Sequence, residues 1–114
     1  MIIGILKEIK SEEHRVCMTP SGVTRMVGSG HAVVVEAGAG KGSGYTDDEY
    51  VRAGAVIEAN PAAIYARAEM VMHVKEPQFR EVGLIRPDQI LFTFLHLAAN
   101  EALTRGLIKA GSIN

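Results

Sequence analysis

The sequence contains little that would place it outside the ordinary soluble proteins. Its single cysteine, Cys17, cannot form an internal disulfide bond, which favours a reducing compartment. No apolar run approaches the ~18–20 residues that a membrane-spanning helix requires. The N-terminal apolar stretch is short and precedes its lysines, unlike the order in a signal peptide. We therefore expect a soluble, cytoplasmic protein.

Neither positive nor negative charge is in marked excess. The formal net charge is −1, so neither nucleic acid nor an anionic membrane is expected as a partner. The apolar share of 47% and the charged share of 22% are typical of globular proteins. A chain of 114 residues is long enough to bury the core of one modest domain.

Apolar runs alternate along the chain with segments of helical periodicity. Helix starts are indicated where Thr19 and Asn60 precede prolines, at the capping box 46–49, and at Asn100, whose helix would reach about residue 110. This alternation predicts an α/β fold: a mostly parallel sheet with flanking helices, Rossmann-like (flavodoxin-like). The predicted strands are 2–6, 32–35, 55–57, 70–74 and 90–94, the last two buried on both faces.

Three polar side chains each follow a predicted strand: Arg15, Lys75 and His96. Because the carboxyl ends of parallel strands lie at one edge of a sheet, these residues are candidates for a single small-anion site. A guanidinium matches a carboxylate bidentately, a lysine at a strand end adds a second cation, and a histidine titrates near neutrality. The alternatives are a solvated arginine, a lysine whose stem lies along apolar surface, and a histidine satisfied within the core.

The glycine-rich run 38–44 follows a predicted strand and precedes a helix, as a dinucleotide-binding turn does. However, Ser43 stands where the third glycine of that motif belongs, and the helix begins with three acidic residues that would repel a pyrophosphate. We therefore interpret the run as a flexible structural loop. No metal site is expected either, because His14, Cys17, His73 and His96 lack the short paired spacings of zinc ligands.

Four motifs, taken in order, resemble alanine dehydrogenases over essentially all 114 residues. They are Ile3–Lys10 with Glu13-His14-Arg15-Val16, Gly38–Tyr45, Val74-Lys75-Glu76-Pro77, and Leu91–Ala98. The resemblance implies NAD-dependent, reversible oxidative deamination of L-alanine to pyruvate and ammonia by a homo-oligomer, a hexamer in full-length members. It implies that Arg15 and Lys75 hold the substrate carboxylate and polarise the reacting group, while His96 is the acid/base residue.

Two positions depart from the family pattern. Phe94 stands where many relatives have tyrosine, and Cys17 replaces a small apolar residue, to which we assign no reactivity.

The resemblance also implies that much of the parent enzyme is absent. Residues 1–114 correspond to the N-terminal part of the catalytic (substrate) domain, without its C-terminal return. The NAD-binding Rossmann domain is expected to lie outside this chain, so no cofactor-binding residue is predicted here, and the truncated chain is expected to be inactive alone. Two alternatives stay open: a fragment of the nicotinamide nucleotide transhydrogenase α subunit, and a non-catalytic module for small-carboxylate binding or oligomerisation.

Overall fold

The computed structural model describes residues 1–8, 16–75 and 84–94. Its sheet has five strands, all parallel, in the order β3-β2-β1-β4-β5. The predicted α/β fold with a parallel sheet and flanking helices is confirmed. The strands are β1 (Ile2–Ile5), β2 (Ala32–Glu36), β3 (Val56–Glu58), β4 (Met70–Lys75) and β5 (Ile90–Phe94).

The described α-helices begin where the sequence indicated. Thr19 and Asn60 accept backbone hydrogen bonds from the first turns of their helices, and Thr46 with Glu49 forms the complete capping box. The helix predicted after Asn100 lies outside the described residues. The helices are α1 (Pro20–Gly28), the short 3-10 helix η1 (Lys41–Ser43), α2 (Asp47–Arg52) and α3 (Pro61–Arg67). None of them is long and apolar enough to cross a membrane.

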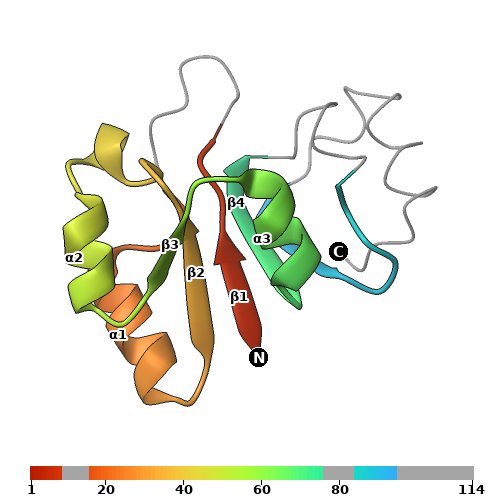
Figure 1. Ribbon diagram of the computed structural model, residues 1–114, viewed down its shortest axis with the longest axis horizontal. Coiled ribbons are helices and arrows are strands. Elements are labelled where there is room, and N and C mark those ends of the chain that lie inside the picture. The colour runs from red at the N-terminus through yellow and green to blue at the C-terminus, as the bar shows by residue number, and fades with distance from the viewer. Residues whose placement is uncertain (9–15, 76–83, 95–114) are drawn as a thin grey trace.

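The helices lie on both faces of the sheet, with α1 and α2 on one side and α3 on the other (Figure 1). Crossovers between parallel strands are as a rule right-handed, so connections that run in opposite directions along the sheet cover opposite faces: β1 leads outward to β2 and β3, whereas α3 leads back to β4. Each face has its own core. Tyr50 and Val23 pack against the first face, and Ile64 and Tyr65 pack against the second.

The turn before β5 is attached to the C-terminal end of α3. The Gln89 side-chain amide donates to the carbonyl oxygens of Tyr65 and Ala68, each at 2.8 Å. The Arg86 guanidinium donates to the same two oxygens, at 2.9 and 2.5 Å. These bonds satisfy carbonyls that a helix end leaves unpaired, and the arginine charge complements the helix dipole.

One prediction about burial is wrong. The strand at 90–94 was expected to be buried on both faces, yet the Phe92 side chain is 59% exposed while its neighbour Leu91 is 3% exposed. The physical reason is the placement of the helices. Leu91 faces the α3 core, whereas α1 and α2 pack over β1, β2 and β3 and do not extend over β5.

Candidate active site

The strand order creates a switch point between β1 and β4, which are neighbours in the sheet. The connection from β1 leads towards β2, whereas β4 continues to β5 on the other side. In open parallel sheets, ligands bind outside the carboxyl ends of the strands at such a point. This edge is therefore the place at which to test the predicted site.

Lys75 lies at this edge, as the last residue of β4. Its backbone pairs with Phe94, the last residue of β5, after an irregularity in the register beyond Met72. Arg15 and His96 lie outside the described residues. The prediction that these three side chains meet around one anion thus stays a prediction.

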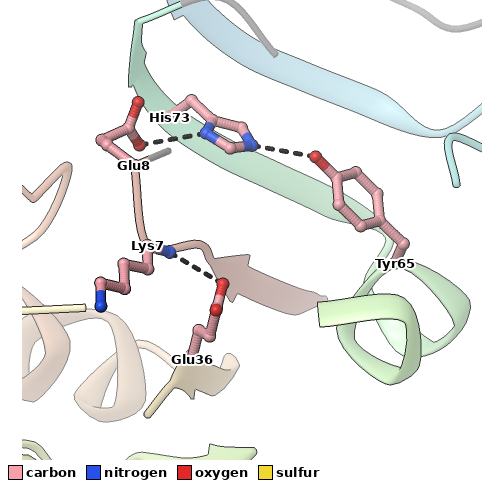
Figure 2. Close-up of polar contacts among 5 residues, drawn as sticks. All are labelled: Lys7, Glu8, Glu36, Tyr65 and His73. Carbon is pink, nitrogen blue, oxygen red and sulfur yellow. Dashed lines mark hydrogen bonds and ion pairs between the residues drawn. The ribbon is translucent and has the colours of Figure 1, made fainter. Parts of the chain in front are cut away.

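A buried chain of polar side chains joins the two strands that flank the switch point (Figure 2). Glu8 follows β1, His73 belongs to β4, and Tyr65 belongs to α3. The His73 Nδ1 atom lies 3.0 Å from Glu8 Oε2, and its Nε2 atom lies 2.9 Å from the Tyr65 hydroxyl. The side chains of His73 and Glu8 are only 1% and 3% exposed, so their polar atoms depend on partners within the protein.

The donor and acceptor roles in the contacts among Glu8, His73 and Tyr65 are limited by the chemistry of the Glu8 carboxylate. An ionised carboxylate only accepts, so the Nδ1 atom of His73 donates to an ionised Glu8. The Tyr65 hydroxyl is the partner of the Nε2 atom, as donor or acceptor according to the tautomer of the ring. In this arrangement His73 holds the Glu8 carboxylate in one orientation at the carboxyl edge of the sheet.

Sequence reasoning missed this arrangement. His73 was considered only as a weak metal ligand within a strand, and Glu8 and Tyr65 received no role. A signal did exist, because a histidine at the centre of an otherwise apolar buried strand requires a polar partner. The identity of that partner depends on which elements pack beside β4. Among the described residues, no group of three potential ligands is placed to hold a metal ion.

The negative charge of Glu8 also acts on the single cysteine. Burial, and then the charge of Glu8, raise the pKa of the Cys17 thiol to about 11. A thiol with so high a pKa is a poor nucleophile at neutral pH, because the reactive species is the thiolate. This agrees with the expectation that Cys17 has no reactive role.

The glycine-rich loop lies at the same edge, after β2, but its polar groups bond within the loop. The Gly38 amide donates to Asp47 Oδ1 at 2.9 Å, and the amide and hydroxyl of Thr46 take part in the capping box. The short helix η1, which the sequence did not predict, turns the chain between them. A hollow of about 410 Å³ beside the loop is bordered by Lys41, Tyr45 and the same Asp47.

Comparison with known proteins identifies the family. Residues 4–113 match the model of the alanine dehydrogenase/PNT N-terminal domain. The chain belongs to this family. The resemblance that the four sequence motifs indicated is thereby confirmed.

The relatives within the alanine dehydrogenase/PNT family include curated enzymes and solved structures. The alanine dehydrogenase of Halomonas elongata is 49% identical over 112 residues, which is 98% of this chain and 30% of that protein. The Bacillus subtilis alanine dehydrogenase is 50% identical over 111 residues, 97% of this chain and 29% of that protein. This chain therefore spans about three tenths of the length of these curated relatives.

Two solved structures extend the comparison to the fold. An L-alanine dehydrogenase structure superposes with a TM-score of 0.94 at 46% identity, covering 98% of this chain and 31% of that chain. The transhydrogenase from Sinorhizobium meliloti superposes with a TM-score of 0.89 at 32% identity, covering 98% and 33%. The same domain fold thus occurs in both branches of the family.

Proposed function

We propose that residues 1–114 form the substrate-binding part of an NAD-dependent L-alanine dehydrogenase. The reaction is L-alanine, NAD⁺ and water giving pyruvate, ammonium, NADH and a proton, reversibly. The observation that carries this proposal is the position of Lys75, which ends β4 beside the switch point with β1. The similarity to alanine dehydrogenases over nearly the whole chain supports it.

The proposed roles follow from the charge of each group. Arg15 and Lys75 bind the substrate carboxylate, and Lys75 also polarises the reacting carbonyl or imine. His96 exchanges a proton with the substrate oxygen, as suits a group that titrates near neutrality. Two fixed cations orient a small anion, so that the proton transfer and the hydride transfer act on one substrate geometry.

The proposed NAD cofactor does not fit the glycine-rich loop of this chain. The Gly38 amide is engaged by Asp47, and three acidic residues occupy the first turn of α2, where a pyrophosphate would be repelled. We therefore assign NAD to the part of the parent enzyme outside this chain. The proposed parent is a cytoplasmic homo-oligomer.

A chimera tests the proposal directly. The 114 residues replace the matching segment of the Bacillus subtilis alanine dehydrogenase, and NADH oxidation is measured with pyruvate and ammonium. We expect activity in the chimera, none in the isolated chain, and loss of pyruvate turnover in Lys75→Ala. The control is Glu69→Gln, because Glu69 Oε1 accepts from the Ile2 amide at the opposite, amino edge of the sheet. A correctly folded chimera without activity contradicts the proposal.

The transhydrogenase alternative has the structural similarity in its favour. It predicts NAD(H)-linked function without alanine chemistry, and a transhydrogenase has no amino-acid substrate for Lys75 and His96 to bind. Calorimetric titration of the isolated chain distinguishes the dehydrogenase hypothesis from the transhydrogenase alternative. Pyruvate binding that Lys75→Ala abolishes supports the dehydrogenase, whereas binding of NADH alone favours the alternative. Binding of neither leaves the oligomerisation module as the better description of the isolated chain.

A further inference from the structure

Glu8 is the buried carboxylate among the described residues, and the proposed reaction assigns it no role. It follows the central strand β1, and its partner His73 stands two residues before Lys75 in β4. The contact between them thus joins the two strands whose carboxyl ends flank the proposed site.

Three successive contacts fix the position of the Glu8 side chain. Its carboxylate meets His73, and the other nitrogen of His73 meets the Tyr65 hydroxyl (Figure 2). Tyr65 is 1% exposed and is also fixed by its backbone, because its carbonyl oxygen accepts from both Arg86 and Gln89. The chain of contacts therefore runs from the turn before β5, through α3 and β4, to the end of β1.

Such a sequence of contacts leaves the carboxylate little freedom. Fixed polar groups in a low-dielectric site act more strongly on neighbouring charges than mobile ones in water. The negative charge of Glu8 is already felt within the protein, since it helps to raise the pKa of Cys17. A fixed anion at this edge stabilises and orients cationic side chains around it.

We propose that Glu8 is a positioning residue of the substrate site, fixed by His73 and Tyr65, and that it orients the side chain of Lys75, which ends β4 two residues after His73. The inference rests on the proposed function. It differs from a purely structural role in one measurable respect. Loss of the Glu8 charge weakens pyruvate binding selectively, beyond any effect on folding.

The first test removes the charge and keeps the shape. In the active chimera, Glu8→Gln is expected to raise the KM for pyruvate about tenfold or more, as for loss of a charge-assisted contact. The KM for NADH is expected to stay within about twofold, because NAD is assigned to the rest of the enzyme. Glu69→Gln, at the opposite edge, serves as the matched control.

The second test separates the two contacts of His73. Asparagine places its amide near the position of Nδ1 and retains a donor to Glu8, whereas glutamine reaches the position of Nε2 and retains the contact to Tyr65. We expect His73→Asn to raise the pyruvate KM clearly less than His73→Gln, whose effect is expected to resemble that of Glu8→Gln. Equal effects of the two variants contradict the positioning role and indicate a structural one.

A third measurement does not depend on activity. The ¹⁵N NMR signals of the His73 imidazole in the isolated chain are expected to show the proton on Nδ1. A ring that carries its proton only on Nε2 overturns the proposed orientation of Glu8. An inactive parent chimera overturns the proposed function, whereas an active chimera whose pyruvate KM is unchanged in Glu8→Gln overturns the positioning role alone.

Discussion

His73 Nδ1 lies 3.0 Å from Glu8 Oε2, with both side chains buried, 65 residues apart in sequence. This contact connects β4 to the segment after β1 at the edge where the proposed substrate site lies. It also places a negative charge close enough to influence Cys17. Glu8 therefore takes part in the packing of the sheet edge, in the ionisation of Cys17 and in the proposed function.

Cys17 is expected to react slowly with iodoacetamide at pH 8, because its pKa is raised to about 11 and little thiolate is present. Glu8→Gln removes the smaller of the two causes, so the pH at which alkylation becomes fast is expected to move downward. Mass spectrometry of the alkylated chain over a pH series measures this. An unchanged pH profile in Glu8→Gln would show that burial alone controls the thiol, and Glu69→Gln is the control.

Tyr50 is expected to make the fold sensitive to alkali. Burial first, and then nearby acidic groups, raise its pKa to about 12, and its hydroxyl donates to the Met18 carbonyl at 2.8 Å. Because the folded-state pKa exceeds the ordinary value of 10.0, this stabilisation is fully present below about pH 10 and is lost as pH rises towards 12.

Urea unfolding of Tyr50→Phe at several pH values tests this expectation. The variant is expected to lose about 1–3 kcal/mol at pH 8, since the Met18 carbonyl loses a buried donor. Its free energy of unfolding is then expected to fall less steeply than that of the parent between pH 10 and 12. Parallel pH profiles of the two proteins would contradict the assignment.

Gly4 is required by the close packing of α3 on β1. A Cβ atom at Gly4 would lie 2.6 Å from Ile64 Cγ2 and 3.1 Å from Ala68 Cβ, both within a packed core. Gly4→Ala is therefore expected to cost about 1–3 kcal/mol through overpacking. Gly28→Ala is the matched control, because a Cβ there meets nothing within 4 Å. Equal urea midpoints for the two variants would show that α3 moves away without cost.

Phe92 is expected to promote self-association of the isolated chain. It is 59% exposed on β5, the last strand of the sheet among the described residues, and exposed apolar surface favours association between molecules. Phe92→Lys is expected to lower the apparent mass in light scattering at high concentration. Val51→Lys is the control, since Val51 is similarly exposed, at 52%, but lies on α2. A monomeric parent chain would refute this expectation.

Local patterns in the sequence were sufficient to predict the α-helices and strands of the described fold. Apolar runs and helix caps such as Thr46 with Glu49 depend on neighbouring residues only, so the starts of α1, α2 and α3 and the bounds of the strands were predicted closely. Alternation of strands and helices was enough to predict a parallel sheet. The four motifs, taken together, were enough to indicate the family.

Only the tertiary structure decided which side chains meet. Strand order brings β1 beside β4, and α3 packs over both, so Glu8, His73 and Tyr65 come together from three separate elements. It also decided that one side of β5 is exposed at Phe92, because the direction of each crossover determines which face its helix covers. Hydrophobic periodicity in the sequence predicts that a residue faces a core. Which residue it contacts there is determined by the packing of distant parts of the chain.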